Sequence, residues 1–120
     1  MLRVVVADDS RVMRQIVVRT LRQAGYDWDI TEATDGAEAF AIARAEQPDL
    51  VLSDWNMPNM TGIDLLRALR AAGDDVPFGF VTSEGSPEMR ERADGAGAMF
   101  LIAKPFTADT FRDALQPVLG

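Results

Sequence analysis

The sequence predicts an α/β fold, a doubly wound, five-stranded parallel sheet with helices on both faces. Short apolar segments alternate five times with segments of helical periodicity along the 120 residues, which is typical of consecutive βαβ units. The apolar segments are nearly continuous, as in strands that are buried on both sides. Because such crossovers are right-handed, helices should cover both faces of the sheet. The length fits one domain, residues 1–120.

The first half of the chain is expected to alternate between strands and helices. Its first strand is short, apolar and β-branched. Ser10 can cap the helix that follows and Gly25 can end it, whereas Pro48 closes the second, Ala-rich helix. In order, the expected elements are a strand at residues 3–7, a helix from Ser10 to about Ala24, a strand at 29–33, a helix at 36–47 and a strand at 50–53.

The second half continues the same alternation. Leucines of the third helix share one stripe, and Pro87 stands in the first turn of the fourth helix. Thr107 is the expected cap of the last helix, in which Pro117 is a weak point. In order, the expected elements are a helix at residues 61–72, a strand at 78–82, a helix at 87–96, a strand at 99–103 and a helix at 107–119.

Composition excludes several classes of function. The chain has no cysteine and no histidine, which excludes disulfides, thiolate metal sites and phosphohistidine chemistry of its own. With 12 basic and 19 acidic residues, the net charge of −7 would repel nucleic acid. No apolar run approaches the ~20 residues of a membrane span, and the N-terminal residues show no signal-peptide pattern. We therefore expect a cytoplasmic protein with neither a nucleic-acid nor a membrane partner.

Polar side chains stand at the ends of four predicted strands, where function is expected. In a doubly wound sheet, ligands bind beyond the carboxyl ends of the strands, at the switch point of the strand order. This edge would hold three carboxylates, two hydroxyls and one ammonium. They belong to Asp8 and Asp9 after the first strand, Asp54 after the third, Thr82 and Ser83 at the fourth, and Lys104 after the fifth.

The three aspartates favour a metal site over ordinary helix caps. A single Asp after a strand is most often a cap. Three of them on neighbouring strands repel one another and raise each other's pKa, so keeping them ionised requires a cation. An all-oxygen ligand set selects Mg²⁺ or Ca²⁺. Mg²⁺ suits a site of few carboxylates that accepts a phosphoryl oxygen, and nothing here resembles a twelve-residue Ca²⁺ loop.

The same residues fit phosphoryl transfer. A carboxylate beside Mg²⁺ can act as a nucleophile toward phosphorus and form an aspartyl phosphate. Lys104 can neutralise the developing charge on the phosphoryl oxygens, and Thr82 can donate a hydrogen bond to them.

Three motifs together resemble the receiver domain of two-component response regulators. They are Asp8-Asp9, residues 53–62 (SDWNMPNMTG) with Thr82 after them, and Lys104-Pro105-Phe106. The resemblance covers essentially the whole chain, and residues 53–62 are especially similar to chemotaxis regulators. It implies a flavodoxin-like sheet of strand order 2-1-3-4-5. It also implies a signalling switch, which is no enzyme beyond catalysing its own phosphoryl uptake and loss.

The resemblance implies a role for each matched residue. A sensor histidine kinase would supply the phosphoryl group, which would bias a two-state equilibrium and reshape an output face between about residues 87 and 114. Asp54 resembles the phospho-acceptor. Asp9 would hold Mg²⁺ directly, Asp8 through water and Asn56 by its backbone carbonyl. Thr82 would couple the phosphoryl group to the output face, Lys104 resembles the lysine that often precedes a cis proline, and Glu84 would tune the rate of hydrolysis of the phosphoryl group.

Two positions depart from the family's pattern. The family usually has Tyr or Phe three residues before the lysine, as the partner of the threonine, where this chain has Leu101. Phe100 is adjacent, but neighbouring strand residues point to opposite faces unless a bulge re-aims one of them. Ser83 stands where the family prefers Ala or Gly. Both departures should change the lifetime or the readout of phosphorylation without preventing it.

Two further features have alternative interpretations. Trp55 is either a gate over the pocket or a half-exposed aromatic. The arginines of the first helix form either a solvated face or a kinase-docking surface; they are Arg11, Arg14, Arg19 and Arg22.

The leading functional hypothesis is a monomeric chemotaxis receiver that binds a flagellar motor switch protein when phosphorylated. A phosphorelay or adaptor receiver, or a piece of a longer regulator, is the alternative. A haloacid-dehalogenase-type phosphatase would carry its nucleophile in an Asp-x-Asp motif on the first strand and would have a cap insertion. A flavin carrier would need a phosphate loop where Asp8 and Asp9 stand.

Overall fold

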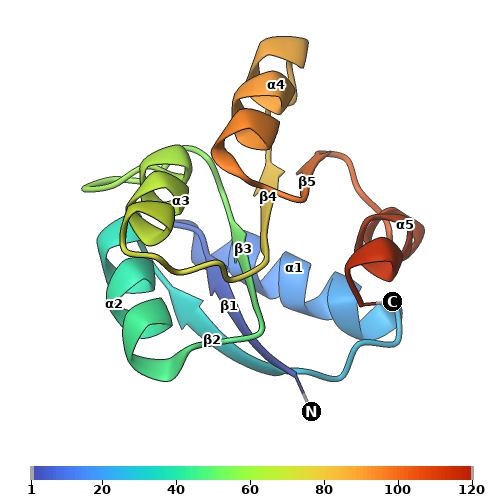
Figure 1. Ribbon diagram of the computed structural model, residues 1–120. Helices are drawn as coiled ribbons and strands as arrows, with labels where there is room; N and C mark the ends of the chain where they lie inside the picture. The colour runs from blue at the N-terminus through green and yellow to red at the C-terminus, as the bar shows by residue number, and fades with distance from the viewer. Residues whose placement is uncertain (1, 120) are drawn as a thin grey trace.

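The computed structural model describes residues 2–119, within which five parallel strands alternate with five helices (Figure 1). The strand order β2-β1-β3-β4-β5 confirms the predicted flavodoxin-like topology. Ala7, the last residue of β1, pairs with Ala33 on one side and Ser53 on the other, so three strand ends lie level at the switch point. The elements are β1 (Arg3–Ala7), α1 (Arg11–Gln23), β2 (Asp29–Ala33), α2 (Gly36–Glu46), β3 (Leu50–Ser53), α3 (Gly62–Ala71), β4 (Phe78–Thr82), α4 (Pro87–Ala96), β5 (Phe100–Ala103) and α5 (Ala108–Leu119).

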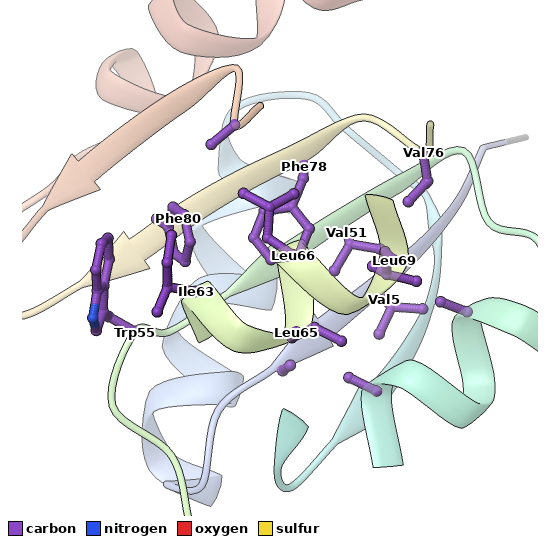
Figure 2. Close-up of a cluster of buried hydrophobic side chains, with 14 of the residues drawn as sticks. Val5, Val51, Trp55, Ile63, Leu65, Leu66, Leu69, Val76, Phe78 and Phe80 are labelled. Carbon is purple, nitrogen blue, oxygen red and sulfur yellow. The ribbon is translucent and has the colours of Figure 1, made fainter. Parts of the chain in front are cut away.

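The two faces of the sheet bury separate apolar layers. Val4 and Val6 of β1 belong to the layer covered by α1 and α5, whereas Val5 belongs to the layer covered by α2, α3 and α4. Figure 2 shows the second layer, in which Leu65 and Leu66 of α3 lie over the sheet. The alternation follows from the two-residue period of a strand. It explains why the strands read as continuous apolar runs.

Side-chain caps fix where the loops after the strands turn into helices. In α1 to α4 the residue before the helix accepts a hydrogen bond from the N–H three residues on, at 2.8–3.3 Å. The predicted cap of α5 is present as well, since the Thr107 hydroxyl accepts from the Thr110 N–H at 3.3 Å. The capping residues of α1 to α4 are Ser10, Asp35, Thr61 and Ser86.

The start of β5 differs from the prediction at Met99 and shows on which face of the sheet Phe100 packs. Met99 was expected in a buried strand, but it lies in the bend before β5 with 52% of its surface exposed. The pairing of β5 with β4 is regular, from Phe100 opposite Gly79 onward, so no bulge re-aims the ring. Phe100 packs in the layer of α1 and α5, whereas Leu101 packs in the other layer.

None of the helices described between residues 2 and 119 is long and apolar enough to cross a membrane.

Candidate functional site

Asp8, Asp9 and Asp54 come together at the carboxyl ends of β1 and β3. One carboxylate oxygen of each lies within 4.8 Å of the other two. Asp8 is buried, Asp54 is half-buried and Asp9 is exposed. The backbone holds the two loops at the same level, because the Asp54 N–H donates to the Ala7 carbonyl at 2.9 Å and the Asp8 N–H to the Ala33 carbonyl at 3.1 Å.

Burial raises the pKa of two of these carboxyl groups. For Asp8, loss of water is the largest cause and the charges of Asp54 and Asp9 add to it, so its pKa is raised to about 6. The Ser10 N–H, which donates to Asp8 Oδ1 at 2.8 Å, and the charge of Lys104 oppose the shift. The pKa of Asp54 is also raised, mainly by burial. A bound cation would relieve this crowding of negative charge.

The Asp54 carboxylate is oriented by its neighbours. The Trp55 N–H donates to Asp54 Oδ1 at 2.7 Å, which leaves the second oxygen of this carboxylate available to another partner. Burial is the largest influence on the pKa of this carboxyl group and raises it, whereas the nearby Thr82 hydroxyl, itself buried, acts to lower it. The same hydroxyl accepts from the Glu84 N–H at 3.4 Å. Ser83 and Glu84 are themselves exposed.

Lys104 lies at this edge without an ion-pair partner among the residues from 2 to 119. Its backbone N–H donates to the Thr82 carbonyl at 3.0 Å, which continues the β4–β5 ladder. The bond between Lys104 and Pro105 is cis, as the family resemblance implied. The exposed side chain lines a groove of about 400 Å³ together with Met13 and Ile16 of α1. An ammonium with no fixed partner is free to move toward an incoming anion.

The loop after β3 packs tightly around Asp54. Gly62 donates its N–H to the Trp55 carbonyl at 2.8 Å, and a Cβ at this position would collide with the Asp54 carbonyl oxygen. Asn56 is exposed in this loop, and its backbone N–H acts to lower the pKa of the Asp54 carboxyl group.

Trp55 is neither a surface gate nor half-exposed. Only 7% of its surface is accessible. Its ring lies 4.8 Å from that of Phe80, centroid to centroid, and the Arg92 guanidinium of α4 lies 5.4 Å above it. The ring is buried because residues far along the chain, on β4 and α4, close over it.

Arg14 is a second side chain whose place the sequence did not reveal. It was grouped with the exposed arginines of α1, but it is buried and donates to the Asp8 carbonyl. Helical spacing holds a signal for this, because Arg14, Val17 and Leu21 stand at i, i+3 and i+7 and are all buried.

The donor set fits a hard divalent cation. The three carboxylates offer oxygen only, and the chain has no histidine or cysteine to add a softer ligand. The residues that could hold such a cation are Asp8, Asp9 and Asp54; a contribution from the Asn56 carbonyl stays a prediction.

Comparison with known proteins identifies the family. A model described as the response regulator receiver domain matches residues 4–116. The chemotaxis protein CheY homolog of Campylobacter jejuni is 38% identical over 99% of this chain and 93% of its own length; the chemotaxis protein CheY1 of Helicobacter pylori is also 38% identical, over 99% and 98%. Among solved structures, the chemotaxis response regulator CheY4 of Vibrio cholerae has a TM-score of 0.85 at 38% identity and covers 98% of both chains. The chain therefore belongs to the family of response regulator receiver domains.

Proposed function

We propose that this receiver accepts a phosphoryl group on Asp54 from a sensor histidine kinase, in a reaction that requires Mg²⁺. The observation that carries the proposal is the cluster of three carboxylates within 4.8 Å. It lies beside the buried Thr82 hydroxyl and the Lys104 ammonium, which forms no ion pair with any residue from 2 to 119. Two of the carboxyl groups have a raised pKa, as expected of groups that await a cation. Because the chain has no histidine, the donor histidine lies on another protein.

The chemistry follows from the orientation of Asp54. The carboxylate oxygen that does not accept the Trp55 N–H attacks the phosphorus of a phosphohistidine. A P–O bond forms, the P–N bond breaks, and the imidazole nitrogen that leaves takes a proton from solvent. Thr82 donates to one phosphoryl oxygen and Lys104 moves in to neutralise another. Mg²⁺, when bound, supplies the positive charge that lets an anionic donor approach three aspartates.

Asp54 can receive the phosphoryl group only if the kinase reaches this edge, and α1 offers a surface for it. The groove beside Lys104 is lined by Met13, Ile16, Pro105 and Phe106. Ile16 is 39% exposed and Val12, on the same helix, 64%. Exposed apolar patches rimmed by polar residues are typical of protein-binding surfaces, which supports kinase docking on α1.

The output is protein–protein signalling in the cytoplasm by a monomer. We place it in chemotaxis, with a flagellar motor switch protein as the partner of the phosphorylated form, because chemotaxis proteins are among its similar relatives over nearly their whole length. A phosphorelay, adaptor or longer regulator is the alternative. Leu101 is consistent with this alternative, because it stands where the family usually has an aromatic residue that couples phosphorylation to output.

The proposal is tested by incubating the protein with acetyl phosphate and Mg²⁺ and measuring its intact mass. We expect a mass increase of one phosphoryl group, which maps to Asp54 and is absent in Asp54→Asn and after chelation of Mg²⁺. Asp64→Asn, at an exposed carboxylate on α3, is the matched control and should phosphorylate normally. A phosphoryl group on another residue, or none in the wild type with its fold intact, would refute the proposal.

A further inference from the structure

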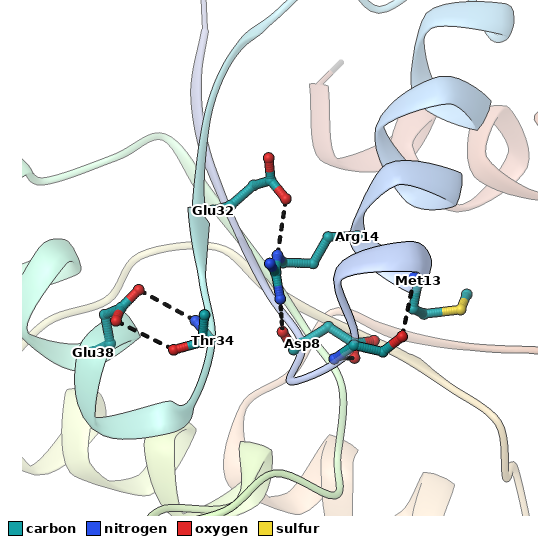
Figure 3. A network of polar contacts seen from close by, with 7 residues as sticks. Asp8, Met13, Arg14, Glu32, Thr34 and Glu38 are labelled. Atoms are coloured by element: carbon teal, nitrogen blue, oxygen red, sulfur yellow. Dashed lines mark hydrogen bonds and ion pairs between the residues drawn. The ribbon is translucent and has the colours of Figure 1, made fainter.

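Arg14 is a buried cation that contacts the backbone of Asp8, the first residue of the acidic pair (Figure 3). Three other arginines of α1, at positions 11, 19 and 22, are exposed, whereas the Arg14 side chain retains only 10% of its exposure. A buried guanidinium is expected to have fixed partners. Its partners therefore indicate what it does.

The guanidinium joins three elements of the fold. Its Nη1 donates to the main-chain carbonyl of Asp8 at 2.7 Å, and its Nε donates to Glu32 Oε1 on β2 at 2.8 Å. Both contacts are seen in Figure 3. Neither bond goes to a carboxylate of the acidic cluster. Arg14 thus binds the backbone that carries these carboxylates and leaves their oxygens free.

The carbonyl that Arg14 holds belongs to the peptide unit between Asp8 and Asp9. The orientation of this unit sets the direction in which both side chains leave the backbone. The N–H of Asp8 is fixed separately by the Ala33 carbonyl at 3.1 Å, and its Oδ1 accepts from the Ser10 N–H at 2.8 Å. With Arg14 in place, the main chain of Asp8 is held on both sides.

We propose that Arg14 is a positioning residue for the metal-holding pair and acts through the Asp8–Asp9 peptide unit. The inference rests on the proposed function, since it concerns the same site. Glu32 has the supporting part, because it fixes the Nε side of the guanidinium so that Nη1 points at the carbonyl. Groups that orient metal ligands typically change metal affinity 10- to 100-fold when they are removed.

Positioning and simple charge predict opposite results. A guanidinium close to the site repels Mg²⁺, so if Arg14 acted only by its charge, its removal would tighten Mg²⁺ binding. If it positions the pair, its removal weakens binding. Lysine separates the two effects further, because it keeps the charge but lacks the planar fork that serves the Asp8 carbonyl and Glu32 together.

The test is a titration with Mg²⁺ alone, monitored by the fluorescence of Trp55 in a Trp28→Phe background. The variants are Arg14→Met and Arg14→Lys, and the matched control is Arg19→Met on the exposed face of α1. We expect Kd to rise at least about 10-fold in Arg14→Met and several-fold in Arg14→Lys, and to be unchanged in Arg19→Met. Equal or tighter binding in both Arg14 variants would overturn the inference. Arg14→Lys decides alone if Arg14→Met does not fold. Absence of Mg²⁺ binding in the wild type would instead refute the proposed function, and the inference with it.

Discussion

In the acidic pocket, Asp8 and Asp54 are each oriented by an N–H from one or two residues along the chain, at 2.8 Å and 2.7 Å. On the face of α4, β5 and α5, which we propose as the output face, the comparable bond runs from the Arg90 guanidinium to the Leu101 carbonyl at 2.9 Å, eleven residues away. Local bonds thus orient the two carboxylates themselves. Longer-range bonds hold the elements in both regions, since Arg14 reaches the Asp8 carbonyl and Glu32 from α1 and Arg90 reaches β5 from α4.

The largest expected effect comes from the ionisation of Asp8. Its folded pKa of about 6 exceeds the ordinary value of 3.8, so the folded state binds the proton more tightly than the unfolded chain. Without Mg²⁺, the stability linked to Asp8 is therefore fully present below about pH 4 and is lost as the pH rises through about 6, by up to about 3 kcal/mol. Urea unfolding between pH 4 and 8 measures this effect: as the pH rises, the free energy of unfolding of Asp8→Asn should increasingly exceed that of the wild type. A constant difference would show that Asp8 is not perturbed.

Two glycine substitutions contrast the pocket with the output face. Gly62→Ala forces a Cβ against the Asp54 carbonyl oxygen, and we expect a loss of about 1–3 kcal/mol of stability together with slower phosphorylation. Gly95→Ala in α4 meets nothing within 4 Å, and helix propensity should make it about 0.5–1 kcal/mol more stable. Thermal unfolding and acetyl phosphate uptake report both effects. Similar results for the two variants would contradict the tight packing of the loop around Asp54.

Leu101→Tyr should strengthen the coupling between the acidic pocket and the face of α4, β5 and α5. Leu101 packs in the layer of α2, α3 and α4, and the Phe100 ring lies in the opposite layer; no aromatic ring of β5 therefore shares a layer with Leu101. Beryllofluoride is a stable mimic of the phosphoryl group. If the missing aromatic weakens the coupling between the pocket and α4, Leu101→Tyr should increase the response of α4 to beryllofluoride about five-fold, which corresponds to a coupling free energy of roughly 1 kcal/mol. Hydrogen exchange of α4 measures this, and Leu101→Met controls for size without a ring. Equal responses in all three proteins would show that Leu101 is no defect.

The smallest expected effect is at the contact between α4 and Trp55. The Arg92 guanidinium lies 5.4 Å from the ring centroid, and a cation–π contact of an exposed arginine contributes about 0.5–1 kcal/mol. Arg92→Met should lower stability by that amount and weaken the attachment of α4 to the loop after Asp54. Arg112→Met on α5, which removes an exposed ion pair with Asp109, should cost less. Urea unfolding compares them, and equal losses would count against the contact with Trp55.

The sequence predicted the fold and the candidate site through the same regularity. Continuous apolar strands alternating with helices define a parallel sheet, and its topology decides which strand ends adjoin. Asp8, Asp9 and Asp54 could therefore be grouped before any coordinates were known. All ten elements were expected within about two residues of where they lie, and the caps at Ser10 and Thr107 were read from residue type alone.

What the sequence did not predict depends on contacts between distant residues. Trp55 is buried by Phe80 and Arg92, which come 25 and 37 positions later. Arg14 was assigned to a solvated face or a docking surface because a charged residue is rarely buried unless paired, and its partner Glu32 lies on another element. Met99 is apolar and precedes a strand, but its exposure follows from the bend after α4.

The central claim, that Asp54 accepts a phosphoryl group in a Mg²⁺-dependent pocket, is tested most directly by Trp55 fluorescence. In a Trp28→Phe background the signal comes from the ring whose backbone N–H donates to Asp54 Oδ1. Addition of Mg²⁺ and then beryllofluoride, a stable mimic of the phosphoryl group, should give a saturable change that requires Mg²⁺ and is absent in Asp54→Asn. The same change in Asp54→Asn, or no change in a folded wild type, would contradict the claim.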